Sequence, residues 1–225
     1  EIKNCQNCKS QFTIEPDDFA FYEKMKVPPP TFCPDCRMIR RQSFRNERSL
    51  YHRKCDLCRS DIISMYQPNA RFPIYCNNCW FSDQLDASMF GRDYDFQKPF
   101  FEQFNELLLL VPRLALEVYQ NEGCLFTNYT WLSKNIYLSS SALRSENIMY
   151  SHTAWNAKDS IDCLQVYFGE LCYEIVNCYR CVNSKYIVNS RDCLDSSFLF
   201  DCKGSTNCFG GINLRNQQYR IFNTK

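Results

Sequence analysis

Eight cysteines near the start of the chain are spaced as metal ligands. They form four Cys-x-x-Cys pairs: Cys5 with Cys8, Cys33 with Cys36, Cys55 with Cys58, and Cys76 with Cys79. Zinc ligands must be deprotonated and close together, which thiolates in such pairs provide, whereas cystine frameworks seldom space every cysteine this way. The spacing therefore predicts two Zn²⁺ ions and a reducing compartment.

The gaps between the pairs limit how they combine. Twenty-four residues separate Cys8 from Cys33, and 17 separate Cys58 from Cys76. Both gaps suit a zinc ribbon or a treble clef, so the simplest pairing is sequential, with a cross-brace of first with third and second with fourth as the alternative. A closed four-cysteine site leaves no coordination position for water or substrate, so both ions should stabilise the fold and not catalyse.

Further residues around the first two pairs match a known pattern. They are Cys5-x-x-Cys8, Phe12, the segment Phe21-Tyr22-Glu23-Lys24, prolines 28–30, and Cys33-Pro34-Asp35-Cys36-Arg37. Over residues 5–41 the chain resembles the probable zinc-ribbon domain family, and its whole layout resembles uncharacterised zinc-ribbon proteins of uncultivated bacteria. The resemblance implies zinc binding and little else.

A basic segment lies between the second and third cysteine pairs. Residues 37–60 hold two acidic residues and eight basic ones, which are Arg37, Arg40, Arg41, Arg45, Arg48, Arg53, Lys54 and Arg59. Four of the arginines recur at helical spacing, in steps of four, four and three, so a helix leaving the second pair would align four guanidinium groups on one face.

Such a face predicts contact with nucleic acid. Arginine binds phosphate through two parallel hydrogen bonds, and the nearby Phe44, Tyr51 and His52 could stack on exposed bases. The whole chain has 26 basic and 25 acidic residues, so any attraction to phosphate must be local. We therefore expect an RNA or ribonucleoprotein partner; the alternative is a helix face that only meets solvent.

The middle of the chain is predicted to be a helical connector. Pro99 followed by Phe100-Phe101-Glu102-Gln103-Phe104 predicts a helix with proline at its first turn, and Pro112 should interrupt it. We predict a zinc-binding domain over residues 1–82, a helical connector and cap over 83–122, and a repeat domain over 123–225.

The repeat domain shows cysteines or isoleucines at a fixed register. One column, at intervals of 15, holds Ile148, Cys163, Cys178, Cys193 and Cys208, each preceded by Asn or Asp; upstream the interval shortens to 12 through Cys124 and Ile136. Such a period with small apolar residues predicts a narrow β-solenoid of about 12–15 residues per coil, with cysteines as core residues and Asx side chains at corners. Disulfides between coils are the alternative.

The solenoid suggests two other functions. Exposed aromatic residues could make it a scaffold for a protein partner; they are Tyr167, Phe168, Tyr186, Phe198 and Phe200. Alternatively, acidic residues with a neighbouring arginine could cleave or eliminate polysaccharide; they are Asp192, Asp195, Asp201 and Arg191. No catalytic constellation is evident, so we assign no catalytic residue and favour a protein that is not an enzyme.

Targeting signals are not apparent in the sequence. The chain lacks an apolar run of about 18 residues, and its first residues, Glu1-Ile2-Lys3-Asn4-Cys5, resemble neither a signal peptide nor a transit segment. We expect a cytoplasmic protein with no membrane partner, and the oligomeric state stays open.

Overall fold

The computed structural model describes residues 1–225 except 168, 178–179, 181, 190 and 192–193. The chain divides into two compact units, Glu1–Asn46 and Glu47–Lys225, so the cysteines are divided between them as well. The first unit contains β1 (Ile2–Asn4), β2 (Gln11–Thr13), α1 (Pro16–Lys24) and α2 (Pro34–Gln42).

The first unit is a hairpin followed by two helices. Strands β1 and β2 pair antiparallel, and the first cysteine pair lies in the loop between them. Helix α1 begins with a proline, and the Asp18 carboxylate accepts a hydrogen bond of 3.0 Å from the Glu15 backbone N–H, which satisfies a free donor at the helix start. Helix α2 begins directly after Cys33, with Pro34 at its first position.

Helix α2 is shorter than the arginine spacing predicts. It ends at Gln42, so Arg45 and Arg48 lie beyond it, and the prediction of one helical face with four guanidinium groups is wrong. The Ser43 hydroxyl donates a hydrogen bond of 2.7 Å to the Arg40 carbonyl, and Arg45 N–H donates to the Gln42 carbonyl at 3.0 Å. These contacts satisfy the last carbonyls and turn the chain out of the helix.

The second unit begins with the same arrangement. It contains β3 (Tyr51–Lys54), β4 (Asp61–Ser64), β5 (Ile74–Tyr75), α3 (Asn77–Trp80), the 3₁₀ helix η1 (Ala87–Phe90), α4 (Phe100–Leu110), β6 (Arg113–Leu114) and β7 (Val118–Tyr119). Strands β3 and β4 form an antiparallel hairpin around the third cysteine pair, and α3 begins directly after Cys76.

The connector contains the predicted helix. Helix α4 starts after Pro99 and ends before Pro112, as the two prolines predict. None of its residues is buried. Beyond it, β6 pairs in parallel with β5, which joins the metal-binding segment to the start of the solenoid. Among the residues that the structure describes, no helix is both long and apolar enough to cross a bilayer.

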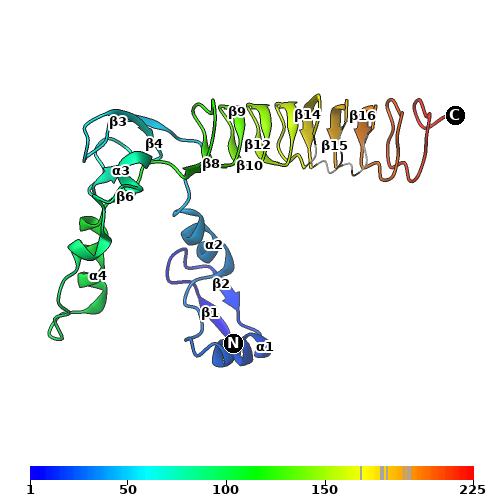
Figure 1. Ribbon diagram of the computed structural model, residues 1–225. Coiled ribbons are helices and arrows are strands. Elements are labelled where there is room, and N and C mark those ends of the chain that lie inside the picture. Colours follow the sequence, from blue (N-terminus) through cyan, green and yellow to red (C-terminus); the bar gives the residue numbers. More distant parts are fainter. Residues whose placement is uncertain (168, 178–179, 181, 190, 192–193) are drawn as a thin grey trace. The chain divides into compact units, whose positions relative to one another are not determined.

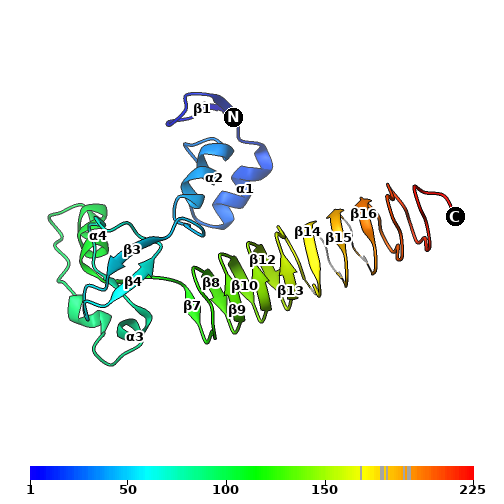
Figure 2. The ribbon, with the colours of Figure 1, turned by 90° about the horizontal axis from the view of Figure 1, so that it is seen from above.

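The predicted narrow β-solenoid is confirmed. Its strands are β8 (Asn128–Trp131), β9 (Lys134–Tyr137), β10 (Ser140–Leu143), β11 (Glu146–Met149), β12 (His152–Trp155), β13 (Lys158–Ile161), β14 (Cys172–Val176), β15 (Lys185–Val188) and β16 (Ser197–Phe200). They pair only in parallel with strands of neighbouring coils, and Figures 1 and 2 show the coils stacked along one axis.

One coil corresponds to an interval of 12 along the sequence, as the hydrogen bonds between equivalent positions show. Thr130 pairs with Ala142, which in turn pairs with Ala154. The column at intervals of 15 is therefore not a coil. Within a coil the buried positions recur at every third position, so a step of 15 advances by one coil and one further inward position. Two members of that column, Cys178 and Cys193, lie outside the described residues.

A left-handed residue precedes nearly every inward position that the structure describes. Asn147, Asp162 and Asn207 have φ angles of 55°, 56° and 54°, so the predicted Asx residues do occupy corners of the coil. Asparagine tolerates this conformation better than most residues. Successive corners also bond to one another: the Asn147 side chain accepts a hydrogen bond of 3.0 Å from Asn135 and donates one of 2.7 Å to Asp159.

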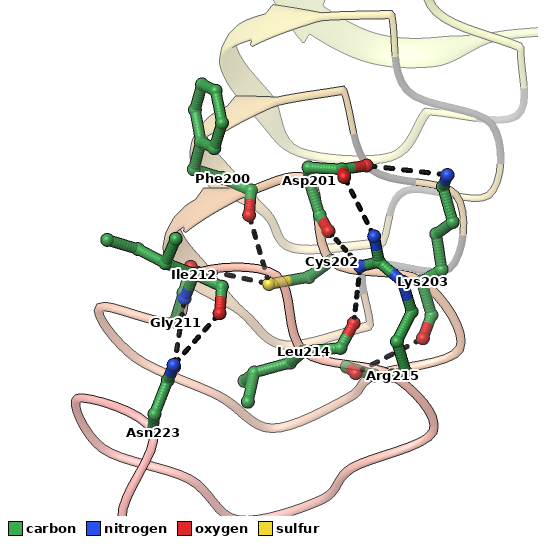
Figure 3. Close-up of polar contacts among 10 residues, drawn as sticks. Phe200, Asp201, Cys202, Lys203, Gly211, Ile212, Leu214, Arg215 and Asn223 are labelled. Carbon is green, nitrogen blue, oxygen red and sulfur yellow. Dashed lines mark hydrogen bonds and ion pairs between the residues drawn. The ribbon is translucent and has the colours of Figure 1, made fainter.

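The core combines aliphatic side chains with serine and cysteine side chains that hydrogen-bond to the next coil. The buried Ser151 hydroxyl donates to the Met149 carbonyl at 2.8 Å and accepts the Cys163 N–H at 3.1 Å. The buried Cys202 thiol points inward, 3.5 Å from the Phe200 carbonyl and 3.3 Å from the Gly211 carbonyl (Figure 3). The described cysteines are free thiols, so the alternative of disulfides between coils is not supported there.

The corner geometry leads to a test at Asn147. Asn147→Val should lower the free energy of unfolding by about 1–2 kcal/mol more than Asn147→Gly, because glycine keeps the left-handed conformation and valine opposes it. Both variants lose the hydrogen bonds that the Asn147 side chain makes to Asn135 and Asp159. The difference between their free energies of unfolding therefore reports the effect of the backbone conformation alone. Urea unfolding measures it. As a control, Met149→Val at an outward position with extended backbone should change the free energy of unfolding by less than about 0.5 kcal/mol. If Asn147→Val and Met149→Val were equally destabilising, the corner assignment would be contradicted.

Candidate metal centres

The structure brings the eight predicted ligands together as two groups of four. One group is Cys5, Cys8, Cys33 and Cys36; the other is Cys55, Cys58, Cys76 and Cys79; within each, the ligand atoms lie within 4.8 Å of one another. The sequential pairing is therefore confirmed and the cross-brace is excluded. Each unit of the chain holds one complete group that could bind a metal ion.

The first group is assembled by a tight turn and a helix start. The Cys5 carbonyl accepts Lys9 N–H at 3.0 Å, and Cys5 N–H donates to the Ser10 carbonyl at 2.9 Å. This turn requires Lys9 in the left-handed region, at φ 65°. The other two sulfurs come from the start of α2, where Cys33 N–H donates to the Cys5 Sγ at 3.3 Å. Backbone groups thus fix the turn that carries Cys5 and join it to the start of α2.

The second group repeats the first contact by contact. The Cys55 carbonyl accepts Arg59 N–H at 3.0 Å, Cys55 N–H donates to Ser60 at 2.9 Å, and Arg59 has φ 64°. Cys76 N–H donates to the Cys55 Sγ at 3.3 Å. In both units a hairpin turn supplies two thiols and a helix start supplies two, which is the arrangement of a treble clef, one of the two predicted alternatives.

Sulfur separations fit a tetrahedral ion. The Sγ atoms of Cys8 and Cys33 are 3.6 Å apart, and those of Cys58 and Cys76 are 3.8 Å apart. A disulfide would require about 2.05 Å. Four sulfurs placed about 2.3 Å from a central ion lie about 3.8 Å from one another. The spacing is therefore that of metal ligands.

The thiols of one group have divergent acidities. Burial raises the pKa of Cys5, but N–H groups of Cys33, Cys8 and Asn7 outweigh burial and lower it to about 6. For Cys33, a backbone hydrogen bond from Cys36 lowers the pKa, but burial and three neighbouring thiols raise it to about 12. Four thiolates this close repel one another, and only a bound cation would let all four ionise.

The second group shows the same division. The Ser60 hydroxyl and N–H lower the pKa of Cys58 to about 6. Burial and the neighbouring thiols raise the pKa of Cys79 to about 12. Each group therefore combines thiols with a lowered pKa, ready to bind a cation, with thiols that would lose their protons only when the ion arrives.

The eight predicted basic residues are divided between the units. Arg37, Arg40, Arg41 and Arg45 belong to the first, whereas Arg48, Arg53, Lys54 and Arg59 belong to the second. They do not form one continuous helical face, because α2 ends before Arg45.

In the first unit, three arginines surround a cavity of about 320 Å³. Its lining residues are Arg37, Arg40, Arg41 and Phe44. Arg37 Nη1 donates to the Tyr22 hydroxyl at 3.0 Å, while its Nε is buried with no hydrogen-bond partner among the described residues. The Phe44 side chain is 88% exposed. We call these four residues the α2 pocket.

In the second unit, the basic side chains have acidic neighbours or a cavity beside them. The Arg53 side chain is 7% exposed, and its guanidinium contacts Asp56 at 2.8 Å and the Gln67 carbonyl at 3.0 Å, so it holds this segment together. Lys54 lies 3.0 Å from Asp61, and Arg59 lies 3.9 Å from Asp56.

Arg48 lines a larger cavity that no sequence pattern predicts. This cavity, of about 480 Å³, lies between residues 47–50 and the solenoid, beside Phe126 and Tyr150. Next to it, Glu47 lies 3.4 Å from His152 Nε2, whose Nδ1 is 2.7 Å from the Ser140 hydroxyl. Ser140 is only 2% exposed, so we interpret these contacts as holding the chain segment against the coil.

The acidic residues considered for catalysis serve the solenoid itself. Asp195 accepts a hydrogen bond from Asn183 at 3.1 Å, and Asp201 pairs with Arg215 at 2.8 Å (Figure 3). The Arg215 hydrogen bond lowers the pKa of Asp201 despite partial burial. Asp195 and Asp201 are half a coil apart, on opposite corners, so they do not converge on one substrate. Asp192 lies outside the described residues.

Metal content tests the two groups separately. The purified chain should carry two metal equivalents; Cys33→Ser should lose one and Cys76→Ser the other, because each variant opens a different four-thiol group. Cys172→Ser, in the solenoid core, should keep both. Elemental analysis after desalting measures this. Loss of both ions from either single variant, or less than one equivalent in the unaltered chain, would refute two independent sites.

Comparison with known proteins adds no family assignment. No protein-family model, curated protein or solved structure matches the chain. The metal groups are consistent with zinc-ribbon-like units, but the resemblance over residues 5–41 is not confirmed by a match. The function must therefore be inferred from the geometry of the sites themselves.

Proposed function

We propose that this chain is a zinc-stabilised, non-enzymatic protein that binds RNA, alone or in a ribonucleoprotein, through the α2 pocket. The observation that carries the proposal is the convergence of three arginines and an exposed phenylalanine on a cavity of about 320 Å³. A solvated helix face would have no need of such a cavity or of a buried guanidinium nitrogen.

The pocket has the chemistry of a phosphate site. A phosphate oxygen would supply the hydrogen-bond acceptor that the buried Arg37 Nε lacks among the described residues. Arg40 and Arg41 are exposed beside it and provide further positive charge. The Arg40 guanidinium also lies 5.2 Å from the centre of the Phe32 ring, which orients it while leaving its edges free.

Phe44 supports a single-stranded nucleic acid over other anions. Its ring is almost wholly exposed next to the arginines, where it contributes little to any core. An aromatic ring beside a phosphate site is the usual platform for an unstacked base. A simple phosphate or sulfate site would have no use for it.

Zinc is the metal that best suits the ligand sets. Closed groups of four thiolates favour soft ions, and zinc forms such sites without redox chemistry. In the first unit, Cys5, Cys33 and Cys36 with Phe12 and Phe32 make up the buried cluster, so the ion would replace a hydrophobic core. The free thiols also favour a reducing compartment, and we propose the cytoplasm.

The arginines can be tested by salt dependence. Arg40→Ala/Arg41→Ala should reduce the slope of log affinity against log salt by about 1.4 for single-stranded RNA, because each phosphate contact contributes about 0.7. Fluorescence anisotropy with a mixed-sequence oligonucleotide measures this. Lys24→Ala/Arg71→Ala removes the same charge outside the pocket and should leave the slope unchanged. Equal losses in both variants would mean a diffuse effect of charge, and no binding at low salt would rule out the proposal.

Phe44 can be tested apart from the charges. Phe44→Ala should weaken binding of the same RNA by about 1–3 kcal/mol while keeping its salt slope, since stacking releases no counterions. Binding of inorganic polyphosphate should not change. If polyphosphate binding falls equally, Phe44 supports the pocket's structure and does not stack on a base.

A further inference from the structure

The last described coils of the solenoid carry a continuous apolar surface. Seven large side chains there are between 40% and 72% exposed: Tyr186, Phe198, Phe200, Phe209, Ile212, Ile221 and Phe222. We call this set the apolar strip. Scattered exposed hydrophobic residues are ordinary, but a contiguous set of this size marks an interaction surface.

The strip is built by the left-handed corner at Phe198, the outward position after it and the coil repeat together. On β16, Phe198 and Phe200 face outward on either side of the buried Leu199. One coil later Ile212 pairs with Phe200, and Figure 3 shows both side chains directed away from the inward-pointing Cys202. Because the coils keep one length in sequence, equivalent side chains of consecutive coils form rows along the solenoid axis.

The aromatic rings of the strip contact one another along the axis. Ring centres are 4.8 Å apart between Tyr186 and Phe198, where the rings are stacked, and 5.2 Å apart between Phe198 and Phe209. The row continues at 6.2 Å from Phe209 to Phe222. Each ring is held by its neighbours, so the surface would lose little side-chain entropy when it binds.

Charged groups border the strip. Asp201 follows Phe200 and pairs with Arg215 at 2.8 Å and with Lys203 at 3.6 Å (Figure 3). An apolar centre with a polar border is the anatomy of a protein interface.

A second copy of this chain is the occupant that the geometry favours. Successive coils lie about 4.8 Å apart along the solenoid axis. A second copy of the chain has the same spacing, so the side chains of one copy can lie opposite those of the other, coil by coil. A two-fold axis would place each strip against the other. Seven half-exposed large side chains offer on the order of 700 Å² per copy, close to the roughly 800 Å² of a standard interface.

We propose that the chain forms a two-fold dimer through face-to-face packing of its apolar strips. The proposal is independent of RNA binding, because no residue of the α2 pocket takes part. The dimer would carry two such pockets, and a long RNA that reached both would be held more tightly than by one.

The test is the mass of the nuclease-treated, metal-loaded chain in solution. Sedimentation velocity should give a dimer of the 26.7 kDa chain at micromolar concentration. Phe198→Asn/Phe200→Lys should raise the dimer dissociation constant at least 100-fold. Asparagine suits the left-handed backbone at residue 198, where φ is 56°, and an unchanged thermal transition would show that the variant is folded.

The matched control alters exposed apolar residues outside the solenoid. Phe101→Lys/Leu108→Lys on α4 removes two large exposed side chains outside the solenoid and should leave the dimer intact. A monomer at all concentrations up to about 100 μM, well above the affinity of a standard interface, would overturn the proposal. The proposal would also be overturned if the Phe198→Asn/Phe200→Lys variant still formed the dimer, or if the Phe101→Lys/Leu108→Lys control lost it to the same extent.

A second readout does not depend on the folding of the strip variant. A photo-crosslinking phenylalanine analogue at position 209 should yield covalent dimers, because Phe209 lies within the proposed interface. The same analogue at position 101 should yield none. Crosslinking at position 101 alone would place the contact at α4 and refute the strip.

Discussion

The width of the solenoid depends on one constraint: the chain returns to the same register at intervals of 12, which leaves room for only four inward side chains in each coil. At about 3.3 Å per residue the coil is roughly 40 Å around, so the chain must change direction at every third position. Each change is made by a residue in the left-handed region, as at Asn147 and Asp162. Serine, alanine, cysteine and isoleucine fill the interior because larger side chains would not fit.

The same constraint determines the outer surface. With one inward position in three, the other two point outward, and equivalent positions of successive coils form rows. Glu122, Lys134, Glu146, Lys158 and Glu170 form one such row of alternating charge, and Glu122 lies 3.1 Å from Lys134. Farther along, aromatic and aliphatic residues form the apolar strip. A repeat that is uniform inside can thus present chemically different surfaces along its length.

The metal groups solve a different problem. A segment as short as Glu1–Asn46 cannot bury enough apolar surface to be stable alone, and helix α1 of this unit has no buried residue. Four thiols from the hairpin turn and the start of α2 supply the missing core if they bind zinc. Arg37, Arg40 and Arg41 follow on the same helix, so an ion at its start would also fix the position of the α2 pocket.

Local spacing was sufficient to predict the ligands, their sequential pairing as the simplest solution, the helix between Pro99 and Pro112, and the narrow solenoid. It gave the coil length only as a range of 12–15, since steps of 12 and 15 both return to an inward position; the Glu and Lys row at intervals of 12 was the signal that distinguishes them. The folded chain was needed to show that α2 ends before Arg45 and that Arg53 pairs with Asp56. It was also needed to show that Phe198 and Phe209 share one surface. These outcomes depend on contacts between residues distant in sequence or on competing hydrogen bonds, which spacing alone does not encode.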